Sequence, residues 1–548
     1  MKEGFIVKRL SSRKTCFNII RVSFVLAILL GIVCFTVPEA RADVYYVKQG
    51  SSGDGSEWSK AFGDLQSGLD AADSGDEIWV AAGTYYPTSD HGLGIGDRGK
   101  HFKMKNGVGI YGGFAGTETA RGQRNWNSHV TILSGDIGNE NDASDNCYHV
   151  IFNYPEGLDG TAAIDGFTIT GGNANHESEA LHQSGGGFYN SSASITVSNC
   201  VIRGNSAGNS GYGGGMCNSY SDPTITDCVF ENNTSDSMGG GILNGDSNPT
   251  VTNCRFENNA AAYGGGMDSY SNSNPIITNC AFIRNTAFYD GGGSGGGFEI
   301  YGFSTLKITN CKFIENSADD GGGLTLDVAY SPPDVVATIT NCLFVGNSST
   351  GGGGIQFIGK QSEEDVQLIN STFNGNSAVR GGGMIMVYNA SPAIKNTILW
   401  GNSATEKGPE ICITDYLPGN PTFSYCDIAG SGGSEAWNMA MGTDGGENID
   451  ADPQFVDASS GDLHLPSGSP CIDTGDNGAV PAGVATDLDG NGRIVDGTVD
   501  RGCYEYQSVS PVPPAKGIPT LSEWGIIIFA LLTASAAIVF LRRKKITA

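Results

Sequence analysis

Apolar residues in the middle of the chain come in short runs that recur at a nearly constant interval. Each run opens with Asn or Asp, usually followed by Cys, one variable residue and Phe, Ile or Leu, and successive openings are 28, 26, 26, 31, 31, 29 and 26 residues apart. Most runs are followed by three glycines and one apolar residue, and this self-similarity predicts a repeat architecture. The openings are Asn199, Asp227, Asn253, Asn279, Asn310, Asn341, Asn370 and Asn396.

A repeat of this length, built from short β-type runs, fits one coil of a parallel β-helix better than an α-hairpin. Strands of successive coils then stack about 4.8 Å apart. The Cys and the Phe of each run are two residues apart, so both side chains point into the same core. We therefore expect an all-β solenoid with one chain passing through every coil.

An asparagine follows each run and predicts a second stack. These residues are Asn205, Asn233, Asn259, Asn285, Asn316, Asn347, Asn376 and Asn402. The residue before them is often Gly or Asn, as a left-handed turn position requires. We expect the amides to form a ladder along the axis that satisfies backbone groups of the turns.

The segment before the repeats predicts a helical cap and the first strands. Residues 61–72 have apolar residues at helical spacing and are expected to close the first coil, while 75–86 and 107–114 are expected to be strands.

The N-terminal 42 residues predict an export signal. A basic leader precedes the apolar run Val22–Val37, and Ala40-Arg41-Ala42 has the small-x-small pattern that signal peptidase reads. We expect cleavage after Ala42. The alternative is an uncleaved anchor helix, although the run is shorter than the ~20 residues that a membrane span prefers.

The C-terminal segment predicts a membrane anchor of a particular kind. Gly525–Leu541 carries no charge, and Arg542–Lys545 supplies a basic tail that the positive-inside rule places in the cytoplasm. Before this span stand Ile518, Pro519, Thr520, Leu521, Trp524 and Gly525, in a pattern that closely resembles the IPTL-CTERM sorting signal of Gram-negative bacteria. The resemblance implies an exosortase-like sorting enzyme and delivery across the inner membrane to the cell surface or outer envelope, with release after C-terminal processing as one outcome. The alternative is an ordinary transmembrane helix.

The repeats also resemble a known fold family. They are similar to the right-handed parallel β-helix repeats of the pectin-lyase-like superfamily, and their F-x-x-N and Gly-Gly-Gly elements look like those of chlamydial polymorphic outer-membrane proteins. The C-terminal β-barrel of the latter is missing from this sequence, so autotransport is not implied. Residues 426–506 resemble the choice-of-anchor region of bacterial surface β-helix proteins, which implies surface presentation without catalysis.

Together these patterns divide the chain into six parts. They are a signal peptide (1–42), an N-terminal cap with the first coils (43–160), β-helix repeats (161–410), C-terminal coils and cap (411–508), a Pro-rich linker (509–517) and the sorting signal with its transmembrane helix and tail (518–548).

The net charge of the chain excludes some classes of binding partner. Without the seven basic and two acidic residues of 1–42 and the four basic residues of 542–545, the chain keeps 20 basic and 56 acidic residues, a formal charge of −36. Such a surface repels nucleic acid, whose binding depends on neutralised phosphates. It also repels anionic polysaccharides unless a divalent cation such as Ca²⁺ bridges the two.

The cysteines predict packing rather than chemistry. Those at 200, 228, 254, 280, 311 and 342 are expected to stack at a spacing longer than the mean Cβ separation of a disulfide, and Ser371 and Thr397 fill the same position later. Metal ligation and cross-linking are the alternatives. Outside the stack, Cys471 with Cys503 and Cys412 with Cys426 are candidates for disulfides in an exported protein.

Two groups of residues are candidates for ligand binding. Asp487, Asp489 and Asn491 match the first half of an EF-type calcium loop, although position twelve is Thr498, and an ordinary turn collects the same residue types. Asp268, Tyr270, Glu299, Tyr301 and Asp327 follow successive glycine triplets and are expected to share one outward face. Carboxylates beside aromatic rings are typical of sugar-binding surfaces, and the alternative is a solvated acidic face.

These observations predict an exported, surface-anchored β-helix protein with a structural, adhesive or glycan-contacting role. The competing interpretation is a polysaccharide lyase or glycoside hydrolase on the same fold. No nucleophile elbow, phosphate loop or zinc spacing is present in the sequence, so enzyme activity rests on fold analogy alone.

Overall fold

The structure, a computed structural model, describes residues 42–140, 142–155, 157–290, 292–303, 305–329, 335–359 and 365–507. The predicted apolar leader, the sorting motif at 518–525 and the predicted span at 525–541 lie outside these residues. No helix within the described part of the chain is long and apolar enough to cross a membrane.

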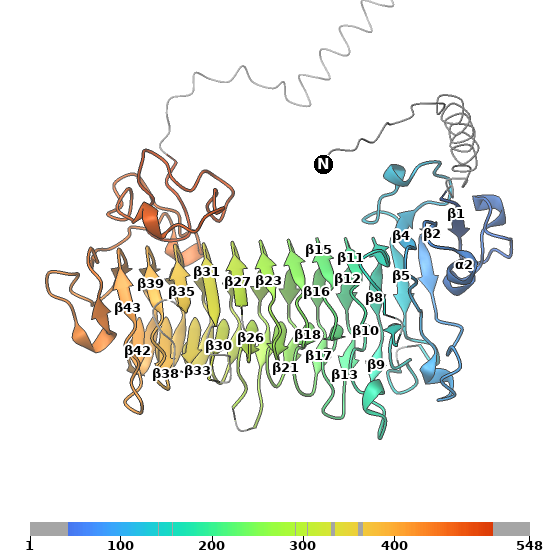
Figure 1. The fold of residues 1–548 in the computed structure, drawn as a ribbon, viewed down its shortest axis with the longest axis horizontal. Coiled ribbons are helices and arrows are strands. Elements are labelled where there is room, and N and C mark those ends of the chain that lie inside the picture. The colour runs from blue at the N-terminus through green and yellow to red at the C-terminus, as the bar shows by residue number, and fades with distance from the viewer. Residues whose placement is uncertain are drawn as a thin grey trace, which may run out of the picture.

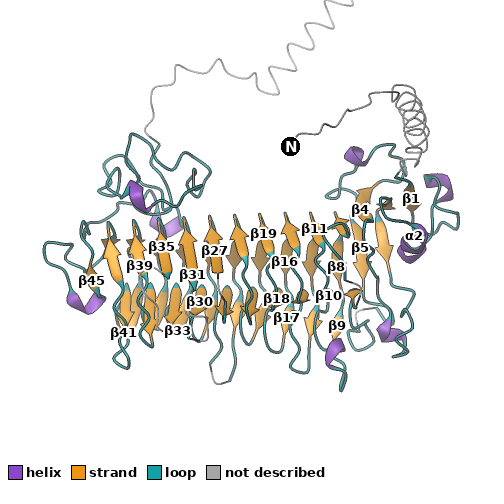
Figure 2. Ribbon diagram, viewed as in Figure 1, coloured by secondary structure: helices purple, strands orange, loops and turns teal. Residues whose placement is uncertain are grey.

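The described chain winds into an elongated right-handed parallel β-helix, as the repeat predicts (Figure 1). A typical coil contributes four short strands, one to each of four sheets that run along the solenoid (Figure 2). Every ladder between these strands is parallel. We name the sheets A, B, C and D; in chain order, a coil passes through C, then A, then B, then D.

Sheets A and B have 14 and 12 strands. Sheet A consists of β1 (Val44–Val47), β2 (Glu77–Ala81), β4 (Gly109–Phe114), β7 (Ala163–Asp165), β11 (Thr196–Ser198), β15 (Thr224–Thr226), β19 (Thr250–Thr252), β23 (Ile276–Thr278), β27 (Thr305–Thr309), β31 (Val336–Thr340), β35 (Val366–Ile369), β39 (Ala393–Lys395), β43 (Thr422–Ser424) and β45 (Thr443–Asp444). Sheet B consists of β3 (Gly83–Tyr85), β5 (Thr131–Ser134), β8 (Thr168–Thr170), β12 (Val201–Arg203), β16 (Val229–Glu231), β20 (Arg255–Glu257), β24 (Ala281–Ile283), β28 (Lys312–Ile314), β32 (Leu343–Val345), β36 (Thr372–Asn374), β40 (Ile398–Leu399) and β44 (Asp427–Ile428).

Sheets C and D have 10 and 9 strands. Sheet C consists of β6 (Ile151–Asn153), β10 (Phe188–Ser191), β14 (Met216–Ser219), β18 (Ile242–Gly245), β22 (Met267–Tyr270), β26 (Phe298–Tyr301), β30 (Leu324–Asp327), β34 (Ile355–Ile358), β38 (Met384–Val387) and β42 (Ile411–Ile413). Sheet D consists of β9 (Asn173–Ala174), β13 (Ser206–Ala207), β17 (Thr234–Ser235), β21 (Ala260–Ala261), β25 (Thr286–Ala287), β29 (Ser317–Ala318), β33 (Ser348–Gly351), β37 (Ser377–Arg380) and β41 (Ser403–Lys407).

The core is a set of stacked side chains, one from each coil. Phe230, Phe256, Phe282, Phe313, Phe344 and Phe373 form a continuous ring stack with centroids 4.4–5.1 Å apart. The predicted cysteine stack is buried beside it. These rings repeat at the strand spacing of the sheets, so one residue type recurs in each column of the core.

The predicted amide ladder is also present. Asn285 donates its Nδ2 hydrogen to Asn316 Oδ1 at 3.0 Å and to the Phe256 carbonyl at 2.9 Å, and its own Oδ1 accepts from the side chain and backbone of Asn259. The pattern runs from Asn205 to Asn402, and there the buried carboxylate of Glu410 takes the place of the next amide oxygen. Burial raises the pKa of Glu410 to about 7.

The chain on the N-terminal side of the repeats adds strands and one short helix. Helix α2 (Leu65–Ala71) begins at Asp64, whose carboxylate accepts from Ser67 N at 2.9 Å, and it packs against β1 and β2. Strands β2, β3 and β4 fall within the predicted strand segments, while β1 was not predicted. The short 3₁₀ turns are η1 (Trp58–Lys60), η2 (Asp97–Gly99), η3 (Arg121–Gln123), η4 (Ala180–His182), η5 (Met439–Met441), η6 (Ala458–Ser460) and η7 (Asn477–Ala479).

Residues 454–507 fold back onto the side of the solenoid, over its last coils (Figure 1). Leu463 and Cys503 pack on Leu343, and Leu465 and Cys471 pack on Ile398. Polar contacts fix this arrangement, because the side chain of Asn396 exchanges two hydrogen bonds with the backbone of Asp476 at 2.8 and 3.0 Å. The outer face of sheet B is therefore covered in this region.

Candidate functional site

Strand register places the predicted carboxylates and tyrosines in two outward rows of sheet C, with Asp268 and Glu299 in one row and Tyr270, Tyr301 and Asp327 in the other. Asp268 of β22 is paired with Glu299 of β26, and Tyr301 is paired with Asp327 of β30. The preceding residues of these strands, Met267 and Phe298, are fully buried in the core, so the next positions face outward. These side chains therefore lie on the outward face of sheet C.

The expectation that this acidic face is exposed is wrong. Asp268 is 0% exposed and Glu299 is 8% exposed, although both lie on the outer side of the sheet. The chain passes directly over them: a Cβ at Gly264 would lie 2.6 Å from Asp268 Cβ, and one at Gly295 would lie 2.5 Å from Glu299 Cβ. Both glycines also have positive φ. The first glycine of each triplet is thus required for this close approach.

The two buried carboxyl groups have few hydrogen-bond partners. Ser294 Oγ donates to Glu299 Oε1 at 2.6 Å, while Glu299 Oε2 and both oxygens of Asp268 are buried with no hydrogen-bond partner. Burial is the main reason that the pKa of Asp268 lies well above its usual value and that of Glu299 is raised to about 8. An ionised carboxylate is costly in such surroundings. The pair therefore retains a proton at neutral pH or requires a cation.

Aromatic side chains flank the acidic pair. The rings of Tyr270 and Tyr301 stack with centroids 5.9 Å apart, and Tyr301 Oη donates to Met238 Sδ at 3.7 Å. Both tyrosines are half-buried. On the N-terminal side the same outward row continues with apolar residues, namely Leu243, Cys217, Tyr189 and Phe152. On the C-terminal side it continues with Thr325, Gln356, Ile385 and Cys412. Asp327 is partly exposed beside this row, and its Oδ1 accepts from Ala329 N at 2.7 Å.

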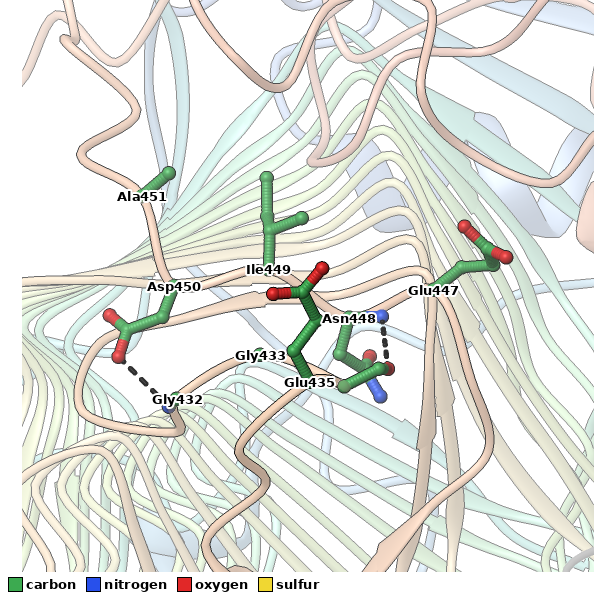
Figure 3. Close-up of a pocket in the computed structure, with 9 residues that line it drawn as sticks. Gly432, Gly433, Glu435, Glu447, Asn448, Ile449, Asp450 and Ala451 are labelled. Carbon is green, nitrogen blue, oxygen red and sulfur yellow. Dashed lines mark hydrogen bonds between the residues drawn. The ribbon is translucent and has the colours of Figure 1, made fainter.

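A cavity of about 520 Å³ lies over the C-terminal part of this row. Its floor contains Gln356 and Ile385, and residues of sheet D and of the turn after β38 form its walls. A second cavity, of about 510 Å³, lies among the turns at 432–435 and 447–451 (Figure 3). There the carboxylate of Asp450 accepts from Gly432 N at 2.9 Å and holds the loop closed.

The second predicted site, at Asp487, Asp489 and Asn491, forms a turn. Asp487 is 1% exposed; its Oδ1 accepts from the backbone N–H groups of Asp489 and Asn491, and its Oδ2 accepts from Glu505 N. Asp489 is paired instead with His464, whose Nε2 lies 2.6 Å from Asp489 Oδ2. Within the described residues no group of three His, Cys, Asp or Glu side chains has the geometry of a metal site. Calcium binding at this turn stays a prediction without geometric support.

The twelve cysteines of the described residues are free and buried. In the stack each thiol donates to the carbonyl two residues before it, for example Cys280 Sγ to Thr278 O at 3.3 Å. Burial raises the pKa of Cys280 and of Cys311 well above the usual value, which makes these two thiols unreactive. The packing interpretation agrees with this geometry. The candidate disulfides between Cys471 and Cys503 and between Cys412 and Cys426 are wrong, and Cys471 instead donates to Asp427 Oδ2 at 3.1 Å.

A histidine cluster in the first coils was not predicted. His149 Nε2 lies 2.9 Å from His182 Nδ1, while His149 Nδ1 lies 2.9 Å from the Gly185 carbonyl and therefore donates to it. His101 is buried nearby, and burial lowers its pKa to about 4. These histidines lie up to 81 residues apart in the sequence and outside the regular repeats. Only the coiling brings them together.

Comparison with known proteins identifies two parts of the chain. Residues 158–333 match the family model "Right handed beta helix region", and residues 516–543 match the model of the IPTL-CTERM motif. The chain therefore carries a β-helix region and a C-terminal sorting motif. Among solved structures it is similar to a rhamnogalacturonan lyase, with a TM-score of 0.32 and 12% sequence identity over 76% of this chain and 91% of that one. The search of curated proteins found no match.

Proposed function

We propose that this protein is exported and displayed at the surface of a Gram-negative cell, where the outer face of sheet C contacts glycans. Signal peptidase removes residues 1–42 during transport across the inner membrane, and the exposed position of Ala42 is compatible with cleavage there. An exosortase-like enzyme then recognises the sorting motif, for which the match at 516–543 is the support. The apolar segment 525–541 holds the chain in the membrane until that step.

The observation that carries the glycan role is the stacked pair Tyr270 and Tyr301 beside the acidic pair. Aromatic rings present apolar faces to the C–H groups of sugar rings, and carboxyl groups accept hydrogen bonds from sugar hydroxyls. Asp327 lies one coil further and is partly exposed, so it is available to such a ligand. The row then runs into the 520 Å³ cavity, which extends the face along the solenoid axis.

Calcium binding between Asp268 and Glu299 forms part of this proposal. Three buried carboxylate oxygens without partners are a source of the oxygen ligands that Ca²⁺ prefers. A cation would also remove the electrostatic cost of placing two carboxylates on adjacent strands. The burial of Asp268 means that such an ion sits beneath the tyrosines and supports their position, rather than bridging directly to sugar.

We also propose that α2 closes the first coil of the solenoid. Leu65 and Leu69 of this helix are 0% and 3% exposed and belong to the main core. A Cβ at Gly68 would lie 3.0 Å from Val47 Cγ2, so the helix packs closely on β1.

The alternative function is that of a polysaccharide lyase or glycoside hydrolase. One observation favours it, because a carboxyl group with a pKa of about 8, such as that of Glu299, suits a general acid. Two observations weigh against it. Asp268 has no exposed surface, and the outward positions of β14, β18, β22, β26 and β30 contain no Lys or Arg that would abstract a proton or bind a uronate.

A glycan array probed with the full-length protein in detergent tests the binding role. We expect Tyr301→Ala to lower binding at least tenfold, while Tyr86→Ala, at an exposed tyrosine away from sheet C, leaves it unchanged. Failure of the wild-type protein to bind any glycan would refute the proposal. Assays for reducing ends and for unsaturated products, run on the same glycans, test the alternative function as a lyase or hydrolase. Product formed by the wild-type protein but not by Glu299→Gln would establish catalysis.

Two variants test sorting. Deletion of 518–548 should release the protein into the medium. Replacement of Pro519 and Trp524 by alanine should disturb processing while the apolar span remains. Normal processing of the double variant would show that the segment is an ordinary membrane anchor and not a sorting signal.

A further inference from the structure

The cavity over the C-terminal part of the sheet C row has the dimensions and lining of a ligand pocket. Its volume of about 520 Å³ falls in the range of small-molecule sites. It lies over β34 and β38, and β37 and β41 of sheet D form one wall. Its lining residues are Asp320, Thr350, Gly351, Gln356, Ile358 and Val379, with Arg380, Ile385, Val387, Tyr388, Glu406 and Thr414.

One polar group in this lining lacks a partner. Gln356 is 5% exposed, and its Oε1 is buried with no hydrogen-bond partner. Asp320 lies beside the amide of Gln356, and burial raises the pKa of that carboxyl group. An acceptor without a hydrogen bond destabilises a folded protein. A ligand that donates an N–H or O–H to this oxygen removes that penalty, which favours its binding.

The rest of the floor is apolar. Ile385 is 4% exposed, and Ile358 and Val387 lie beside it at outward positions of adjacent strands. Tyr388 is 48% exposed at the edge, where its ring makes a T-shaped contact with that of Tyr416 at a centroid distance of 6.0 Å. The floor thus accepts methyl or C–H groups directly next to the unmet acceptor.

The charged groups at the rim are balanced. Arg380 and Glu406 form an ion pair with an N–O distance of 2.8 Å, so the guanidinium is already neutralised. Asp320 adds a further acidic group to the wall. An anionic sugar such as a uronate therefore finds no unpaired cation among the lining residues of this cavity.

We propose that this cavity is a subsite for an N-acetylated amino sugar, which deepens the proposed glycan role and rests on it. Gln356 Oε1 has no surface open to the cavity, so binding requires this side chain to turn outward; the acetamido N–H then donates to Oε1, and the acetyl methyl group packs on Ile385 and Val387. The sugar ring stacks on Tyr388, and its hydroxyl groups reach Asp320 and Glu406. A simple hexose has no group that fills the apolar floor and the acceptor together.

Three trisaccharides with the same β-1,4 linkage separate these contributions. They are N-acetylated chitotriose, its deacetylated counterpart and cellotriose, each titrated calorimetrically into the full-length protein in detergent. We expect the N-acetylated form to bind at least tenfold more tightly than cellotriose. Gln356→Leu should remove this preference and leave cellotriose affinity unchanged, and Tyr388→Ala, at an exposed position, should weaken all three. Gln367→Leu, on sheet A and outside the cavity, is the matched control.

The melting temperature of each variant shows that it is folded. For Gln356→Leu it should change little, since removal of an unmet buried acceptor offsets loss of the amide's hydrogen bond to Asp320. Equal binding of all three sugars, unaffected by Gln356→Leu but weakened by Tyr301→Ala, would overturn this inference and keep the proposed function. Tightest binding of the deacetylated sugar would also overturn it. Absence of binding by any glycan, on the array or here, would overturn both.

Discussion

The acidic pair on sheet C leads to a prediction about stability, namely that Glu299→Gln stabilises the protein above neutral pH. The pKa of Glu299 is about 8 in the folded protein, against an ordinary value near 4.5 in the unfolded chain. A carboxyl group with a raised pKa contributes stability that is present below its unfolded pKa and is lost as pH rises through its folded pKa. The neutral amide of glutamine keeps the contact with Ser294 and does not ionise.

The size of the effect follows from the pKa difference. A difference of about 3.5 units, at ~1.4 kcal/mol per unit, gives about 4 kcal/mol of lost stability at pH 8 and under about 1 kcal/mol at pH 5. Unfolding about 460 ordered residues has an entropy of about 1 kcal/mol/K at ~2.1 cal/mol/K per residue. Glu299→Gln should therefore raise the melting temperature by about 4 °C at pH 8 and by under about 1 °C at pH 5.

Differential scanning calorimetry with EDTA measures this difference across pH 5–9. Asp268→Asn should change stability in the same direction, because burial also raises the pKa of Asp268. Glu315→Gln, at an exposed side chain on the turn after β28, controls for loss of a negative charge and should shift the curve by no more than about 0.5 kcal/mol. Equal or lower stability of Glu299→Gln at pH 8 would show that the charged carboxylate has a favourable partner, and the reasoning from burial would fail.

Four further predictions concern the ion, the ladder, the thiols and the histidines. Calcium should raise the free energy of unfolding of the wild-type protein by about 2.7 kcal/mol at a hundredfold excess over its Kd, and leave that of Glu299→Gln unchanged; an equal rise in both would place the ion elsewhere. Asn285→Ala should cost about 3 kcal/mol in denaturant unfolding because it leaves buried ladder donors unpaired, and a cost under about 1 kcal/mol would show that water replaces the amide. Replacing Cys254 and Cys280 by serine should cost about 1–3 kcal/mol per unpaired hydroxyl, and mass spectrometry that finds disulfides within 200–342 would contradict the packing account. His149→Gln should reduce the stability lost between pH 7 and 5, since burial lowers the pKa of His149 and folding then opposes its protonation; an unchanged pH profile would contradict this.

The repeats could be predicted from sequence because their cause is local. Each coil repeats the same apolar, asparagine and glycine positions, and residues at equivalent positions of successive coils must stack at the strand spacing. The ring stack, the thiol stack, the amide ladder and the pairing of Asp268 with Glu299 all follow from that rule. The positive φ of Gly204, Asn232 and Asn258 follows from the turn in the same way.

Burial of the acidic pair did not follow from alternation along the strand. The alternation of side chains along a strand predicts only that Asp268 points away from the core. Whether water reaches this side chain depends on the path of the preceding turn across the outer face of sheet C. The glycines at 264 and 295 were a signal of that path, because only a residue without Cβ permits the close approach. The sequence shows the triplets but not which side chains lie beneath them.

The remaining surprises come from contacts between distant parts of the chain. Pairing of His149 with His182, docking of 454–507 on sheet B and the contact of Cys471 with Asp427 join residues 33 to 131 positions apart, outside the repeat register. The sequence by itself determined the coil, its register and the residue types of its stacks, since these depend on neighbouring positions repeated many times. Only the tertiary structure decided which polar groups lose water, because desolvation depends on everything that packs against a side chain and not on the strand that carries it.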